Sequence, residues 1–196
     1  MALTATGVHD VAEAVLGCVC AALDQVAEEV PGQPGCPCRV CVVPGQVAWD
    51  GCDGACGPSK PGGQLSVSVA RMWPTTSFPT EDREVRGLRG CSLPATTAVE
   101  LVVTLLRCAP GPGASGCPPS CEELTDSARI LHTDMATLQN AIMCCLPQTA
   151  PTRRGRRFVL GAQRVLGPEG GCVGVEQRVT VAMPGCAPCP GEEGQI

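Results

Sequence analysis

Residues 120–146 read S-C-E-E-L-T-D-S-A-R-I-L-H-T-D-M-A-T-L-Q-N-A-I-M-C-C-L and predict the longest helix of the chain. Apolar side chains recur every three or four residues along this stretch, which keeps them on one side of an α-helix. Ser120 and Glu123 have the spacing of a capping box, Pro118-Pro119 prevents an earlier start, and Pro147 ends the helix. The apolar stripe consists of Leu124, Ala128, Leu131, Met135, Leu138, Ile142 and Cys145. We expect a scaffold helix that lays this stripe on a β-sheet.

The segments on either side of this helix predict the rest of the fold. A second helix is expected at residues 8–29, and strands are expected at residues 39–43, 64–73, 98–108, 158–166 and 172–183. The face of the first helix is predicted to consist of Val11, Val15, Cys18, Ala22 and Val26. Pro74 is expected to end the strand that starts at Gln64. This order predicts an α+β domain with long loops, in which two helices pack on one face of a mainly antiparallel sheet. We assign residues 1–184 to this single domain and residues 185–196 to a C-terminal tail.

Composition excludes several classes of function. The chain has 196 residues and a formal net charge of −5, and only 2% of its residues are aromatic. An acidic chain with so few aromatic side chains to stack on bases is not expected to bind nucleic acid as its main function. No run of eighteen apolar residues is present, so we expect no membrane span, and the N-terminus lacks the basic segment of a signal peptide.

Catalytic motifs are absent from the sequence. His9 and His132 are the only histidines, and neither stands in a zinc-protease, nucleophile-elbow or phosphate-binding motif. We interpret both as helix-surface residues. The sequence therefore predicts a protein that is not an enzyme and needs no cofactor.

Sixteen cysteines are unusual for a chain without an export signal. Three interpretations remain open for the clustered ones: late disulfides, a zinc site, or free thiols that pack as small apolar side chains. These clustered cysteines are Cys36, Cys38, Cys41, Cys52, Cys56, Cys117, Cys121, Cys186 and Cys189. Cys18, Cys20, Cys144 and Cys145 lie in the predicted helices, and we expect them to pack.

Two further segments are candidates for protein contacts. Residues 72–79 contain a Trp and a Phe at a strand exit, where they either close the core as a lid or anchor a partner. Residues 153–157 form a basic turn, which in an acidic chain favours a solvated loop or a protein interface over phosphate binding. The candidate interface residues are Trp49, Met72, Trp73, Phe78, Glu81, Asp82, Arg83, Arg86, Arg89, Arg153, Arg154, Arg156 and Arg157.

Three runs of sequence resemble a group of head–tail and tail proteins from long-tailed phages that infect actinobacteria. They are C-R-V-C-V-V-P-G-Q-V-A-W-D-G-C (38–52), G-Q-L-S-V-S-V-A-R-M-W-P-T-T-S-F-P (63–79) and L-G-P-E-G-G-C-V-G-V-E-Q-R-V-T-V (166–181). The resemblance covers roughly residues 10–182. The order of helices and strands is also similar to that of tail terminator proteins.

This resemblance implies a structural virion protein in the phage neck. A tail terminator forms a hexameric ring that caps the tail tube and joins it to the head, so the implied partners are further copies of the chain, the major tail tube protein and a head–tail connector or stopper. DNA would pass through the lumen only as cargo, and assembly would take place in the bacterial host cytoplasm. The loops at residues 44–63 and 74–97 are expected to reach neighbouring subunits. The alternatives are a stopper or adaptor of the same neck, and a binding module stabilised by zinc or disulfides.

Overall fold

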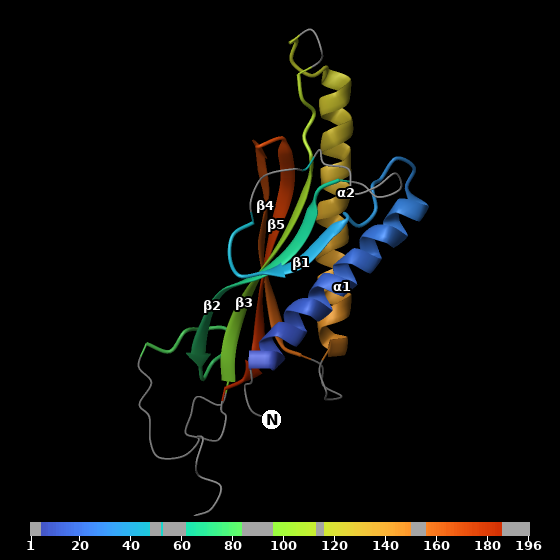
Figure 1. The fold of residues 1–196 in the computed structure, drawn as a ribbon. Helices are drawn as coiled ribbons and strands as arrows, with labels where there is room; N and C mark the ends of the chain where they lie inside the picture. Colours follow the sequence, from blue (N-terminus) through green and yellow to red (C-terminus); the bar gives the residue numbers. More distant parts are fainter. Residues whose placement is uncertain are drawn as a thin grey trace, which may run out of the picture.

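The computed structural model describes residues 5–47, 52, 62–83, 96–112, 116–149 and 156–185. Its elements are α1 (Ala5–Glu29), β1 (Arg39–Val43), β2 (Gln64–Thr75), β3 (Thr96–Cys108), α2 (Cys121–Cys145), the short 3₁₀ helix η1 (Leu146–Thr149), β4 (Phe158–Glu169) and β5 (Cys172–Pro184). The strands form one five-stranded sheet in the order β1-β2-β3-β5-β4. Both helices lie on the same side of this sheet (Figure 1), which confirms the predicted α+β class.

The sheet is antiparallel except at one edge. The pairs β2–β3, β3–β5 and β4–β5 are antiparallel, whereas β1 runs parallel to β2. Hydrophobic periodicity indicates which side of a strand is buried but not the direction in which the strand runs. The sequence therefore did not predict this parallel pair. Because β3 lies between β2 and β5 and is buried on both faces, its prediction as a central strand is confirmed.

Pro74 does not end β2, contrary to expectation. The ladder continues through Pro74, which lies opposite Thr97, to Thr75, which lies opposite Thr96. Because β1 pairs only with Gln64–Ser68, the later part of β2 is an edge on that side. Proline is tolerated on such an edge since its missing N–H leaves no bond of the sheet unmade there.

The start of α2 follows the sequence closely. The Ser120 hydroxyl accepts a hydrogen bond from the Glu123 backbone N–H at 3.2 Å, and the Glu123 carboxylate accepts one from the Ser120 N–H at 2.8 Å. The capping box is therefore confirmed. The hydrogen bonds that the Glu123 carboxylate accepts, first from the Ser120 backbone N–H and then from the Ser120 hydroxyl, lower the pKa of Glu123.

The buried stripes of the two helices differ in part from those predicted. In α2, Leu131, Leu138 and Ile142 are buried as expected, but Leu124 is 51% exposed, because this end of the helix extends past the core. In α1 the predicted Val11 and Val15 are buried. The rest of its buried face is Ala12, Leu16, Val19 and Leu23, whereas Cys18, Ala22 and Val26 are only half-buried at its border.

Disulfides fix the helix layer to itself and to the loops. Where both partners are described residues, the bonds are Cys18–Cys145, Cys20–Cys36 and Cys52–Cys172. The first joins α1 to the end of α2. The expectation that Cys18, Cys20 and Cys145 merely pack was wrong, because sequence separations of 127 and 16 residues are closed by the fold. Cys144 is an exposed thiol, so the expected packing was wrong there too.

Candidate interaction surface

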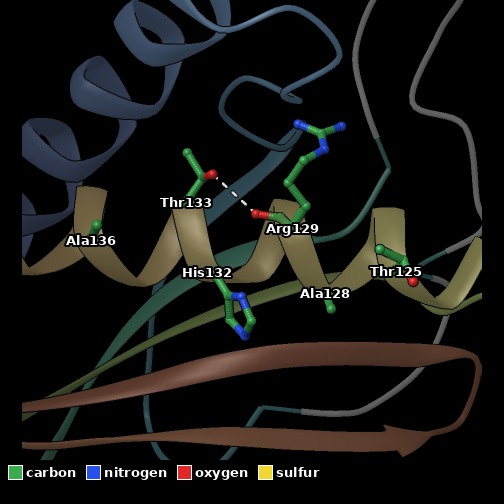
Figure 2. A pocket seen from close by; sticks show the side chains of 6 residues that line it. All are labelled: Thr125, Ala128, Arg129, His132, Thr133 and Ala136. Carbon is green, nitrogen blue, oxygen red and sulfur yellow. Dashed lines mark hydrogen bonds between the residues drawn. The ribbon is translucent and has the colours of Figure 1, made fainter.

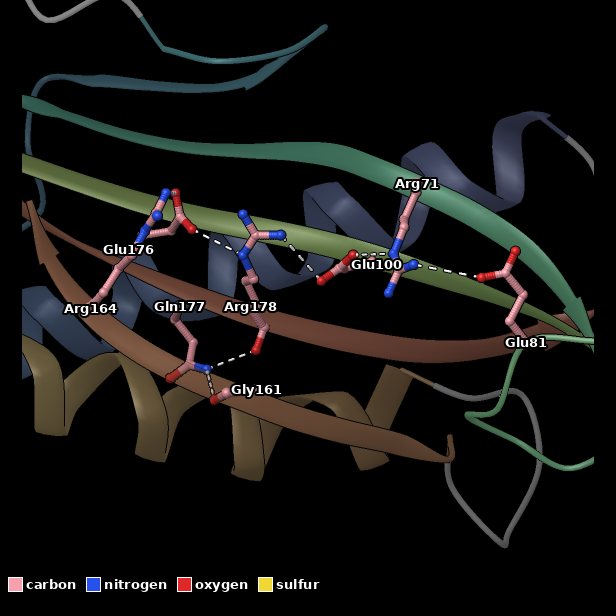
Figure 3. A network of polar contacts seen from close by, with 8 residues as sticks. All are labelled: Arg71, Glu81, Glu100, Gly161, Arg164, Glu176, Gln177 and Arg178. Carbon is pink, nitrogen blue, oxygen red and sulfur yellow. Dashed lines mark hydrogen bonds and ion pairs between the residues drawn. The ribbon is translucent and has the colours of Figure 1, made fainter.

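A ladder of alternating charges crosses the face of the sheet that the helices leave uncovered (Figure 3). We use the name charge ladder for Arg164, Glu176, Arg178, Glu100, Arg71 and Glu81, in this spatial order. Glu100 alternates along β3 with Val99 and Leu101, which point into the core under the helices. The ladder therefore lies on the opposite side of the sheet from α1 and α2.

Close hydrogen bonds hold the centre of the charge ladder. Arg71 Nε donates to Glu100 Oε2 at 2.7 Å, and Arg178 Nη1 approaches Glu100 Oε1 at 3.4 Å. Arg178 Nε donates to Glu176 at 3.1 Å, and Arg164 Nη2 donates to the same carboxylate at 2.9 Å. Glu100 thus bridges Arg71 of β2 and Arg178 of β5. Glu176 bridges Arg178 of β5 and Arg164 of β4.

The three arginines and Glu81 are the exposed members of the charge ladder, and Glu100 and Glu176 are its buried members. The side chains of Glu100 and Glu176 are 11% exposed, whereas those of Arg71, Arg164 and Arg178 are 59%, 58% and 43% exposed. Burial by itself raises the pKa of Glu100, but the hydrogen bonds and charges of Arg71 and Arg178 outweigh it, so the net pKa lies below the ordinary value. The Glu100 carboxylate therefore stays ionised beneath guanidinium groups that still have N–H donors for other partners.

A groove of about 710 Å³ runs along this face beside the ladder. Its floor includes Ser68 and Thr104 from the sheet, and Pro44 and Val47 from the connection after β1 stand over it. Arg164, Glu176 and Arg178 of the charge ladder also line it. The groove and the charge ladder together form one polar surface on this side of the sheet.

Trp73, near the end of β2, is covered by the subunit itself on the sheet face that carries the charge ladder. Trp73 is 6% exposed, its indole N–H donates to the Pro79 carbonyl at 2.9 Å, and the Arg71 guanidinium lies 4.3 Å from its ring centre. This burial favours the lid over the partner anchor, the two alternatives that the sequence left open. Phe78 is half-buried under Arg157, at 5.5 Å from ring centre to guanidinium carbon.

Some of the remaining interface candidates lie within the described residues and others do not. Met72 is 44% exposed. Glu81 and Arg83 are exposed, Asp82 is half-buried, and Glu81 belongs to the charge ladder. Arg156 is half-buried and lies beside Met183. Trp49, Arg86, Arg89, Arg153 and Arg154 lie outside the described residues.

The nine candidate cysteines fall into three groups: disulfide-bonded cysteines, thiols, and cysteines outside the described residues. Cys36 and Cys52 are in disulfides, and Cys38 is also disulfide-bonded, so these three cannot be zinc ligands in this state. Cys41, Cys117 and Cys121 are thiols. Cys56, Cys186 and Cys189 lie outside the described residues. Within the described part of the chain, no three His, Cys, Asp or Glu side chains come together as a metal site.

A second hollow lies along α2 and contains His132 (Figure 2). It has a volume of about 550 Å³ and is lined by Thr125, Ala128, Arg129, His132, Thr133 and Ala136. The imidazole points toward the β4–β5 hairpin, and the one hydrogen bond drawn joins the Thr133 hydroxyl to the Arg129 carbonyl at 3.0 Å. His132 is exposed, in agreement with its interpretation as a helix-surface residue.

Comparison with known proteins identifies no relative. No family matches the chain, and no curated protein is similar enough to count as a match. None of the helices in the described ranges is both long and apolar enough to cross a membrane.

Sequence reasoning missed most of the charge ladder. Only Glu81 of its six members was among the interface candidates. The available signal was the occurrence of the charged residues Arg71, Glu100 and Arg178 inside predicted strands. Their mutual contact depends on the register of the strands, which the sequence does not show.

Proposed function

We propose that this chain is a structural virion protein, a tail terminator that forms a ring on the end of a phage tail tube and joins the tube to the head. The observation that carries the proposal is the one-sided sheet. Two helices cover one face, and the other face bears a charge ladder and a polar groove. Such a face is suited to contact with another protein surface, and a ring subunit needs contact surfaces rather than an active site.

The polar groups of this face support a non-catalytic role. Glu100 and Glu176 are each held by two arginines, so these two carboxylates are paired within the surface itself. Such an arrangement fixes the positions of charges on a surface. The partners in this proposal are further copies of the chain, the major tail tube protein and the connector or stopper on the head side. DNA passes through the lumen, and assembly takes place in the host cytoplasm.

A second candidate is a disulfide-stabilised binding module. The bonds Cys18–Cys145, Cys20–Cys36 and Cys52–Cys172 favour it, because such bonds persist in oxidising surroundings. For a virion protein made in a reducing cytoplasm, the same bonds would form later, after release. The two candidates therefore differ in whether the protein assembles before it is oxidised.

The mass of the purified protein in solution tests these candidates. The full chain is measured by light scattering alone and mixed with its tail tube protein, with and without reductant. A ring, or a ring that forms only on tube ends, supports the terminator. A monomer that ignores tubes but binds the portal and adaptor proteins supports the connector instead. A monomer that binds neither, and melts at a lower temperature in reductant, supports the binding module.

A further inference from the structure

We propose that the subunits of the ring meet head to tail, with the charge ladder of one copy seated on the outer face of α1 of the next copy. This inference rests on the proposed ring function and names the two surfaces that build it. The argument begins with α1.

The exposed face of α1 is acidic and has no Lys or Arg, and its one histidine, His9, lies 3.1 Å from Glu13. The helix contains five acidic residues and neither Lys nor Arg. All five are exposed, and they fall near its two ends: Asp10 and Glu13 at one, Asp24, Glu28 and Glu29 at the other. Gly17 and Ala21 lie between them on the same exposed face. The outer face of α1 is therefore negative at both ends and low in the middle, where another surface can approach closely.

These charges are unfavourable for the helix itself. Glu28 and Glu29 lie in the last turn, where the helix dipole disfavours negative charge, and no basic residue accompanies them. Asp24 and Glu28 are four residues apart, a spacing at which like charges repel. Asp24 has a local role, since its carboxylate accepts a hydrogen bond from the Cys36 N–H at 2.7 Å. Within the described residues, Asp10 and Glu28 have no ion-pair partner that would explain them. Negative side chains that destabilise their own helix, with no local interaction that compensates for them, indicate that the charge has a function.

The charge ladder is the complementary surface on the other side of the same subunit. Its exposed groups are the guanidinium groups of Arg71, Arg178 and Arg164, together with the Glu81 carboxylate at the end next to Arg71. It lies on the sheet face away from the helices (Figure 3). The acidic residues of α1 are exposed, on the side of the helix opposite to the side chains that pack in the core. A contact between two different surfaces on opposite sides of a subunit is heterologous, and it closes into a ring when the rotation between copies allows.

The spacings of the two surfaces agree. Glu13 and Glu28 are fifteen residues apart, about 22 Å along an α-helix. Arg71 and Arg164 are separated by three strand-to-strand steps and by four residues along the strands, a diagonal of about 20 Å. The two outer arginines can therefore face the two acidic ends of α1 at the same time. Arg178, between them, lies over the small residues in the middle.

Charge reversal on each surface tests the contact. The α1 variant is Glu13→Arg with Glu28→Arg, and the ladder variant is Arg71→Glu with Arg164→Glu. We expect each variant alone to lose the ring and to run at the 20.1 kDa mass of one subunit. Mixed in equal amounts, the two variants should assemble again, because each positive α1 then meets a negative ladder and each negative α1 meets a positive one. The mass is measured with and without tail tube protein, beside the full wild-type chain.

The possible failures are distinguishable. If wild type assembles and the α1 variant assembles as well, the contact is wrong and the ring proposal stands. If both variants are monomeric and their mixture stays monomeric, the two surfaces do not meet and the inference fails. If wild type itself forms no ring with or without tubes, the proposed function fails together with the contact.

Folding is checked by circular dichroism. The α1 variant changes two exposed positions and relieves local repulsion, so it should fold and decide the question even if the ladder variant does not. The matched control is Gln25→Arg on the exposed side of α1, which adds positive charge without removing an acid; it should retain the ring.

Discussion

Arg107 of β3 and Asp134 of α2 form a buried ion pair with two parallel hydrogen bonds. Arg107 Nε donates to Asp134 Oδ2 and Nη2 donates to Oδ1, each at 3.0 Å, and the two side chains are 6% and 0% exposed. Arg107 Nη1 also donates to the Gly35 carbonyl at 2.7 Å, and Gln33 donates to Asp134 at 2.9 Å. This pair joins the sheet, α2 and the segment after α1 at one point. Burial raises the pKa of Asp134, against the opposing effect of Arg107 and Gln33.

Removal of one partner of this pair should destabilise the fold strongly. Asp134→Ala leaves the Arg107 charge buried without its counter-ion, and we expect the free energy of unfolding to fall by about 3–5 kcal/mol. The double variant Arg107→Met with Asp134→Leu should lose less than the single one, because no charge remains buried. Asp126→Asn is the control, since Asp126 is exposed and 3.8 Å from Arg129; it should change stability by less than about 0.5 kcal/mol. Denaturant unfolding measures all three, and a harmless Asp134→Ala would show that the pair adds nothing.

The disulfide between the helices should stabilise the folded chain. Cys18 and Cys145 are 127 residues apart in sequence, so their bond restricts the unfolded chain strongly. Replacing both by Ala should lower the free energy of unfolding by about 3 kcal/mol in oxidised protein. Cys144→Ala, which changes the neighbouring exposed thiol, is the control and should have little effect.

Peptide mapping after alkylation supplies an independent check. Cys117, Cys121 and Cys144 should be modified in the native protein, while Cys18 and Cys145 should appear together in one bridged peptide.

The charge ladder should contribute stability that depends on pH. The pKa of Glu100 is lower in the folded chain than its ordinary value, so its contribution is fully present above about pH 4.5 and is lost as the pH falls through the folded pKa. Glu100→Gln should therefore cost about 1–2 kcal/mol at pH 7. The difference from wild type should shrink at acidic pH. Glu169→Gln, at an exposed position of β4, should show no such difference. A cost for Glu100→Gln that stays constant between neutral and acidic pH would contradict this explanation.

Assembly of the ring should weaken with salt. The arginines of the proposed contact are 43–59% exposed in the single subunit, so their attraction to α1 acts partly through water. From about 0.05 M to about 0.5 M salt the Debye length falls from about 14 Å to about 4 Å, and we expect the dissociation constant to rise at least about tenfold. Sedimentation velocity over this range measures the change. Assembly that is equally strong at both salt concentrations would point to an apolar contact instead.

The features that the sequence predicted well are those that depend only on residues close together in the chain. The cap at Ser120 and Glu123 concerns residues three positions apart, and its hydrogen bonds form within one helical turn. The alternation of β2 and the apolar run of β3 likewise lie within single strands. Class and element order follow from such patterns, because local periodicity reports which side of an element is buried.

The features that the sequence could not supply are contacts between distant residues. No local pattern tells that Cys18 faces Cys145, that Arg107 reaches Asp134, or that Arg71 and Arg178 share Glu100. Each of these depends on which strands pair, in which direction and in which register. The sequence by itself determined two helices, several strands and their α+β arrangement, through periodicity and capping. The tertiary structure alone decided the disulfides and the charge ladder. The packing of α1 against α2 brings Cys18 to Cys145, and the pairing of the strands brings side chains from β2, β3, β4 and β5 within hydrogen-bond distance.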